Sequence, residues 1–177
     1  MSTSGTAQFG QSLSGAYSGT LTPTPSTYSY QWQVSADAST NWTSAAGTGN
    51  ATSSYTIAVA DVGKYLRVAV TAAATGYSST FYSSATSVIA NGTFTTGTVT
   101  LASAKVGASG SVSVGTWTPT PSGYTYLWEV STNGGSSWTT AAGGASTNAT
   151  YTPVPAEAGA LLHVKVTGSL SGYNSAT

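Results

Sequence analysis

Apolar and polar residues alternate along two segments that occupy matching places in the two halves of the chain. In residues 28–34 the aromatic and aliphatic side chains share one parity, and Ser or Gln residues fill the other. This period of two is typical of a β-strand with one buried face. The pattern returns at residues 124–130, where Trp128 follows Trp32 at an offset of 96 residues. We therefore expect two copies of one fold, with Trp32 and Trp128 in their cores.

Shorter patterned segments accompany these strands in each copy. Residues 65–70 and 161–166 carry apolar side chains at alternate positions, and residues 54–59 form a further candidate strand. Turn residues separate the segments, as at Asp61-Val62-Gly63. Short strands separated by turns, with no competing helical periodicity, predict an all-β protein made of antiparallel sandwiches.

The repeat divides the chain into two predicted domains, residues 1–90 and 91–177, with a hinge at Asn91-Gly92. A period of 96 residues is longer than the roughly 20–50 residues of a solenoid unit and close to the ~100 residues of one sandwich domain. Each copy is therefore expected to fold around its own core.

The outer edges of the two domains are expected to lack strands. Residues 83–89 are predicted as the last strand of the first domain, and the first strand of the second is predicted at Val99, Thr100 and Leu101. The first copy shows no counterpart of Val99–Leu101, and the second lacks most of a counterpart of residues 83–89. Unpaired edges expose backbone donors and acceptors, which a neighbouring subunit or further repeats would complete; the alternative is that the edges are simply short and frayed.

Charge and cysteine content narrow the function classes. Charged residues make up 5% of the chain, against about 25% in an ordinary domain, and four basic residues balance four acidic ones. We expect no nucleic-acid partner, because nucleic-acid binding needs a basic surface. We also expect little like-charge repulsion between copies of the chain that pack together. The absence of cysteine excludes disulfides and thiolate chemistry. No apolar run of about 18 residues and no Sec-type signal is visible, so membrane insertion is not expected.

A family resemblance covers most of both copies. The succession of YxYQWQxS, a Gly/Ser-rich hairpin ending in Trp, a Ser/Thr-rich strand with Tyr, and ADVGKYLRVAVTA resembles the immunoglobulin-like repeats of bacterial surface proteins and tailed-phage virion proteins. It implies two tandem immunoglobulin-like antiparallel β-sandwiches. Residues 61–65 resemble the corner before the sixth strand, where a tyrosine hydroxyl bonds, although Glu157 and Leu161 alter that corner in the second copy. Such repeats are known chiefly as spacers, adhesive modules and virion decorations, which implies a non-catalytic role.

A second resemblance concerns the hairpin after each tryptophan strand. Residues 131–138 resemble the Asp-box, S-x-D-x-G-x-x-W, of sugar-active proteins, with Asn133 at the aspartate position. Residues 35–42 keep the aspartate as Asp37 but lose the glycine. In this motif the Asp or Asn side chain accepts from turn amides, so a structural role is favoured over sugar contact.

The sequence contains few residues that could carry out catalysis or bind a metal ion. Glycosidases need two carboxyl groups roughly 5–10 Å apart. Asp37 and Asp61 are candidates at one end of the first domain, but Asn133 breaks the pair in the second. His163 is the only histidine and is expected at a solvated position near Lys165, which makes neither a triad nor a metal site. We expect no enzymatic activity and no cofactor or metal.

The aromatic residues outside the predicted cores are the candidate contacts. Rings beside neutral hydroxyl and amide groups are typical of sugar stacking or of a subunit interface. The candidates are Trp42, Tyr77, Trp138 and Tyr173, with Leu127 as an outward apolar residue.

The sequence thus favours a non-catalytic structural or decoration protein on the head or tail surface of a tailed-phage virion. Expected partners are other virion or surface proteins, with self-association through edge strands. The alternative is a repeat fragment of a bacterial cell-surface adhesin that binds glycans, with an extracellular location, and a free-standing glycan-binding module is a third possibility.

Overall fold

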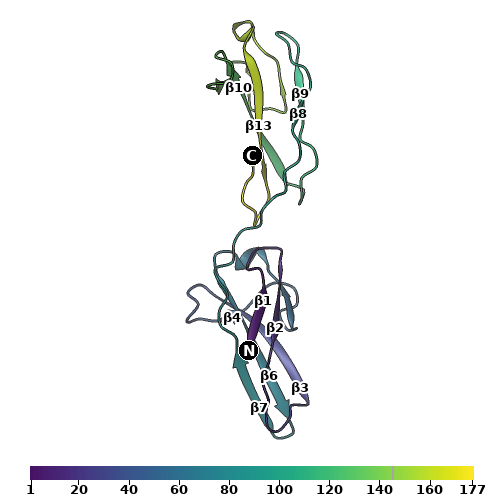
Figure 1. The fold of residues 1–177 in the computed structure, drawn as a ribbon, viewed down its shortest axis with the longest axis vertical. Helices are drawn as coiled ribbons and strands as arrows, with labels where there is room; N and C mark the ends of the chain where they lie inside the picture. Colours follow the sequence, from purple (N-terminus) through teal and green to yellow (C-terminus); the bar gives the residue numbers. More distant parts are fainter. Residues whose placement is uncertain (145) are drawn as a thin grey trace. The chain divides into compact units, whose positions relative to one another are not determined.

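The computed structural model describes residues 1–144 and 146–177, and nearly all regular elements among them are β-strands. The chain divides into two compact units, Met1–Gly92 (unit 1) and Thr93–Thr177 (unit 2) (Figure 1). The helical elements described are two single 3₁₀ turns, η1 (Val59–Asp61) and η2 (Pro155–Glu157). The predicted all-β class is therefore confirmed.

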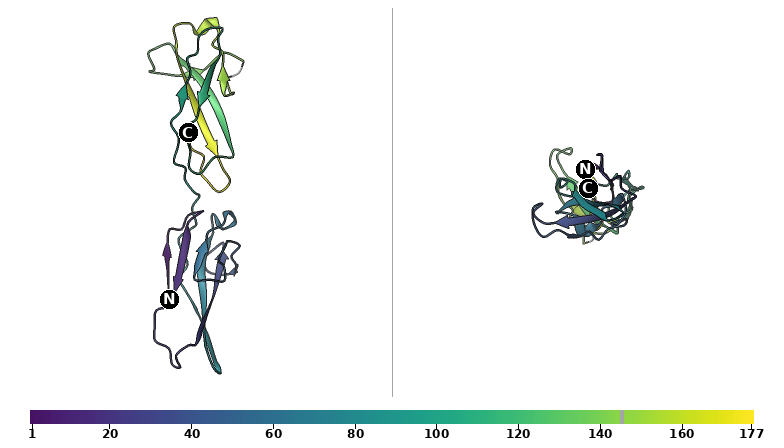
Figure 2. Two further views of the ribbon diagram at one scale, coloured as in Figure 1. Left: turned by 90° about the vertical axis from the view of Figure 1, so that its right-hand side faces the viewer. Right: turned by 90° about the horizontal axis from the view of Figure 1, so that it is seen from below.

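Unit 1 consists of two sheets whose named strands all pair antiparallel. One sheet has the order β4 (Thr43–Ser44), β3 (Thr27–Ser35), β6 (Tyr65–Ala74), β7 (Tyr77–Tyr82). The other has the order β1 (Ser2–Gly5), β2 (Ser12–Ala16), β5 (Ser54–Thr56). Figure 2 (left) shows these two layers of unit 1 side by side.

A tryptophan occupies the centre of the unit 1 core. Trp32 of β3 is 0% exposed, and its ring stacks on Tyr55 of β5 with the ring centroids 5.4 Å apart. Its indole N–H donates to the Thr52 carbonyl at 3.0 Å, so the polar atom of the ring is satisfied. Leu13 of β2 and Leu66 of β6 complete the contact between the sheets. Residues of both sheets therefore share one core.

Unit 2 repeats the arrangement with a smaller core. Its sheets have the orders β11 (Thr139–Thr140), β10 (Gly123–Ser131), β13 (Leu161–Ser169) and β12 (Thr150–Tyr151), β9 (Gly110–Ser113), β8 (Thr100–Leu101). Trp128 is 0% exposed and stacks on Tyr151 at 5.3 Å. Gly110 pairs with Tyr151 where Leu13 pairs with Tyr55 in unit 1, so unit 2 has no side chain at that place.

Two edge predictions are wrong in detail. The first copy does have an outer strand, because β1 pairs with β2 in the register Ser2 to Ala16. Its sequence, STSG, carries no apolar alternation and so gave no strand signal. In the second copy the outer strand contains Thr100 and Leu101, but Val99 precedes it.

The predicted strand at residues 83–89 also needs correction. Tyr77, expected in a loop, begins the strand β7, which follows the tight turn at Gly76 (φ +75°). Residues 83–89 are not a regular strand, but the N–H groups of Ser83, Thr86 and Ile89 still bond to the carbonyls of Val68, Leu66 and Lys64. The candidate strand at residues 54–59 ends at Thr56, and η1 follows it.

Candidate functional site

A buried tyrosine and carboxylate lie beside the core of unit 1. Asp61 of η1 is 1% exposed, and its Oδ2 accepts from the Tyr55 hydroxyl at 2.5 Å and from the Ala58 N–H at 2.9 Å. The Gly47 N–H donates to the Tyr55 hydroxyl at 2.7 Å. Burial, and then the hydrogen bond to Asp61, raise the pKa of Tyr55 well above its ordinary value. This carboxylate therefore joins η1 to the core.

Unit 2 carries the same pair with a longer acid. The Tyr151 hydroxyl donates to both carboxylate oxygens of Glu157, at 2.7 and 2.8 Å. The extra methylene lets Glu157 also reach the Ala142 N–H at 2.7 Å, besides the Val154 N–H at 3.0 Å. Burial alone raises the pKa of Glu157, but the hydrogen bonds from Tyr151 and the two amides outweigh it and hold that pKa below its ordinary value.

A glycine stands against the hydroxyl in both units. A Cβ at Gly47 would lie 2.7 Å from the Tyr55 hydroxyl, and one at Gly143 would lie 2.6 Å from that of Tyr151. The resemblance in residues 61–65 pointed to Tyr65 as the corner tyrosine, but the hydroxyl bonded to the acid belongs to Tyr55. The signal that identifies the pair is a tyrosine six residues before an acid, which both copies keep.

Alkaline pH is expected to destabilise unit 1 through Tyr55. A tyrosine in the unfolded chain ionises near pH 10, whereas buried Tyr55 stays protonated because its pKa is raised. Folding then requires proton uptake, so the stabilisation is complete below about pH 10 and declines as pH rises toward the folded pKa. Urea midpoints measured between pH 8 and pH 11 test this; an equally steep decline in Tyr55→Phe would contradict it.

A cation lies between two aromatic rings on the outer face of the larger sheet of unit 1. The guanidinium carbon of Arg67 lies 4.2 Å from the Trp42 ring centroid and 4.3 Å from that of Tyr82. Its Nε donates to the Gln33 side-chain oxygen at 2.8 Å. The guanidinium lies over the Trp42 ring, so one face of that ring is occupied by the protein itself.

The equivalent face of unit 2 carries a charged network. Glu129 of β10 is 8% exposed, and its Oε2 lies 2.7 Å from His163 Nε2 and 2.8 Å from Lys165 Nζ. The hydrogen bonds from His163 and then Lys165 lower the pKa of Glu129. Trp138 stacks on His163 with the ring centroids 3.6 Å apart. His163 keeps 34% of its side-chain surface exposed, and the ring is held in this network.

The two hairpins use their Asp and Asn side chains internally. Asp37 Oδ1 accepts from the N–H groups of Ser39 and Thr40 at 2.9 and 2.8 Å, and Asp37 Oδ2 accepts from the Thr40 hydroxyl. These hydrogen bonds lower the pKa of Asp37, and the bond from the Thr40 hydroxyl has the largest effect. Asn133 Oδ1 accepts from the Ser137 N–H at 3.0 Å. This geometry is the structural role that the Asp-box resemblance implies.

The remaining candidate residues do not form a single site. Tyr77 is 67% exposed, whereas the Tyr173 ring packs on Phe94 with the centroids 5.2 Å apart. Leu127 is half-buried on β10, where it pairs with Lys165 of β13. Val99 and Leu101 are exposed apolar residues beside or within the edge strand β8, and Thr100 is exposed there as well.

The described residues contain neither a metal-binding cluster nor a membrane-spanning helix. Among the described residues, no three His, Cys, Asp or Glu side chains are grouped so that they could hold a metal ion. The described helices are all too short or too polar to cross a membrane. No protein-family model and no curated protein matches the chain.

Proposed function

We propose that this chain is a non-catalytic structural protein displayed on the surface of a tailed-phage virion. The observation that carries the non-catalytic part is that all four carboxylates of the chain are engaged in holding its own structure. Two are buried with tyrosine partners, one closes a hairpin, and one is bonded to a histidine and a lysine. A carboxyl group that acts as a general acid or base must lie within hydrogen-bond reach of a substrate, which these arrangements oppose.

The order of the strands supports the immunoglobulin-like part of the proposal. The first, second and fifth strands of unit 1 form one sheet, and the third, sixth and seventh lie together in the other. Immunoglobulin-like sandwiches divide their strands in the same way and bury a tryptophan of the third strand between the sheets. Trp32 of β3 and Trp128 of β10 both have that environment.

Surface chemistry supports an assembly role. With 5% charged residues and no net charge, the chain has little electrostatic repulsion to oppose dense packing with copies or partners. In unit 2 the edge strand β8 also presents Leu101, an apolar side chain that is 37% exposed. Exposed edge strands pair readily with other chains.

Immunogold labelling of virions tests the proposal. Antibodies against the chain should label the outside of intact tailed-phage particles released from a lysed culture that expresses it. Leu101→Lys should abolish incorporation, because a charge at β8 opposes strand pairing. Val59→Lys, which changes an exposed apolar residue of η1, is the matched control and should be incorporated normally. Unlabelled particles, or normal incorporation of Leu101→Lys, would contradict the proposal.

A cell-surface adhesin is the second candidate, and one observation favours it. The Tyr77 ring is 67% exposed and lies next to Ser78 and Ser79, a combination that can stack on a sugar and hydrogen-bond its hydroxyls. The same antibodies distinguish the two, because an adhesin would be labelled on intact bacterial cells in the absence of phage particles.

A further inference from the structure

The side chain of Arg67 is fixed in place on the outer face of the larger sheet of unit 1. Its guanidinium lies between the rings of Trp42 and Tyr82, at 4.2 and 4.3 Å from the two ring centroids. Its Nε–H donates to the Gln33 side-chain oxygen at 2.8 Å. These three contacts restrict the rotamers of the arginine, so much of the entropy cost of ordering it is met before any ligand binds.

The two Nη groups of this guanidinium have no partner within the protein. A guanidinium carries N–H donors on both Nη groups as well as on Nε. Within residues 1–144 and 146–177, the hydrogen bond of Arg67 is the one from Nε, and no acidic side chain forms an ion pair with it. No buried side-chain nitrogen in these residues lacks a partner, so the Nη groups are open to solvent. Such a pair of donors matches the two oxygens of a carboxylate.

Unit 2 has a carboxylate at the matching position. At the offset of 96 residues, His163 stands in place of Arg67 and Glu129 in place of Gln33. Both pairs lie directly opposite each other on neighbouring strands, and Glu129 Oε2 lies 2.7 Å from His163 Nε2. Arg67 is always charged, yet the residue opposite it is an uncharged amide. The face of unit 1 therefore carries a positive charge where unit 2 supplies an acid.

The two acidic residues of unit 1 are engaged elsewhere. Asp61 is 1% exposed and accepts from the Tyr55 hydroxyl. Asp37 belongs to the hairpin that also carries Trp42, but its oxygens accept from groups of that hairpin, namely Ser35, Ser39 and Thr40. A carboxylate that pairs with Arg67 must therefore come from another molecule.

The surface beside Arg67 favours a sugar as the carrier of that carboxylate. Tyr82 is 51% exposed, and further along the same face the hydroxyls of Thr71 and Thr80 lie 2.8 Å apart. An aromatic ring next to neutral hydroxyl groups can pack against the C–H groups of a pyranose and hydrogen-bond its hydroxyls. The strands of this sheet contain no cation besides Arg67, so they lack the basic cluster that an acidic peptide would need.

We infer that Arg67, Trp42, Tyr82 and Gln33 form a binding site, the Arg67 site, for a carboxylated saccharide such as a hexuronic acid or sialic acid residue of a glycan. The carboxylate accepts from the Nη groups of Arg67, and the pyranose ring packs against the exposed part of Tyr82. Gln33 holds the guanidinium in the orientation that presents these donors. The inference goes beyond the proposed structural role, because it depends on unit 1 alone.

A sugar titration of the full chain, followed by NMR of ¹⁵N-labelled protein, tests the inference. The acidic probes are sialyllactose and trigalacturonate, and their neutral counterparts are lactose and the methyl ester of trigalacturonate. An acidic probe should shift the signals of the Trp42 indole N–H and the Arg67 Nε–H and leave that of the Trp138 indole unchanged. Its neutral counterpart should bind about tenfold to a hundredfold more weakly, as expected for loss of a hydrogen bond between charged groups. A response to one acid alone identifies the kind of sugar.

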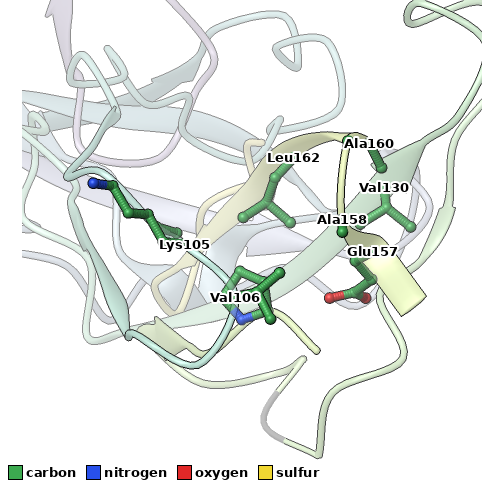
Figure 3. Close-up of a pocket in the computed structure, with 10 residues that line it drawn as sticks. Lys105, Val106, Val130, Glu157, Ala158, Ala160 and Leu162 are labelled. Atoms are coloured by element: carbon green, nitrogen blue, oxygen red, sulfur yellow. The ribbon is translucent and has the colours of Figure 1, made fainter. Parts of the chain in front are cut away.

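Three protein variants give the matched comparison. Arg67→Lys keeps the charge but loses the paired donors, so binding should weaken by about tenfold. Gln33→Glu places opposite Arg67 the acid that unit 2 carries there, and this internal partner should abolish binding. Lys105→Gln is the control, because it removes a positive charge from unit 2. The Lys105 side chain extends away from a cavity of about 320 Å³ beside Val106 and Leu162 (Figure 3), and its loss should leave binding unchanged.

Four results would overturn the inference. The first two are no shift at the Arg67 site with millimolar acidic sugar and equal binding of the neutral counterparts. The third is an equal response to acetate, which would make this a general anion site, and the fourth is tighter binding of a glutamate-rich peptide than of either sugar. The virion test is separable from this one. Unlabelled particles with intact sugar binding would remove the virion role alone, whereas labelled virions without sugar binding would remove only the Arg67 site.

Discussion

Replacing Trp32 with alanine is expected to lower the free energy of unfolding of unit 1 by about 3–5 kcal/mol. The ring is 0% exposed, stacks on Tyr55 and touches both sheets, so its removal leaves a cavity that neither sheet can fill alone. The change also frees the Thr52 carbonyl, which accepts from the indole N–H at 3.0 Å. Loss of packing and loss of a buried hydrogen bond act in the same direction.

Urea unfolding of the full chain, followed through NMR signals assigned to each unit, measures this effect separately from unit 2. Trp42→Ala is the matched control, because it removes the same ring from a partly exposed position beside Arg67. It should cost clearly less, since the cation–π contact contributes only about 0.5–1 kcal/mol at an exposed site. Equal losses for the two variants would show that Trp32 is not the centre of the unit 1 core.

Strong alternation made the central strands predictable. The segments around Trp32 and Trp128 carry aromatic and aliphatic side chains on one parity, and both became nine-residue strands with a buried tryptophan. The edge strands were not predictable in the same way. β1 consists of Ser, Thr and Gly residues, and the aromatic residues of β7 fall on both faces of that strand, so neither shows a regular alternation of polarity and the pairing with a neighbour decides their structure.

The polar contacts depended on register, which the sequence pattern does not contain. Alternation placed Glu129 and His163 on outward faces, but only the pairing of β10 with β13 sets these two residues opposite each other. Once opposite, their side chains meet and cover the carboxylate. The sequence pattern did not predict the hydrogen bond between Tyr55 and Asp61 for a related reason. This bond connects a strand of one sheet to the 3₁₀ turn that leads into the other sheet.

Asp61→Ala is expected to destabilise unit 1 by about 3 kcal/mol or more. Two buried donors, the Tyr55 hydroxyl and the Ala58 N–H, share the same carboxylate oxygen. Each buried donor left without an acceptor costs about 1–3 kcal/mol. Asp61→Asn keeps an oxygen in that place and loses only the charge, so its cost should be smaller.

A double-mutant cycle with Tyr55→Phe apportions the effect. The Tyr55 hydroxyl bond to a charged group is worth about 1.5–3 kcal/mol, so Tyr55→Phe and Asp61→Ala together should cost less than the sum of the single changes by about that amount. Both free energies come from the unit 1 signals in urea titrations of the full chain. Strict additivity would mean that the two groups act independently, and the pair would then not be what joins η1 to the core. A coupling of the expected size would explain why both copies keep a tyrosine six residues before an acid, although the acid itself differs.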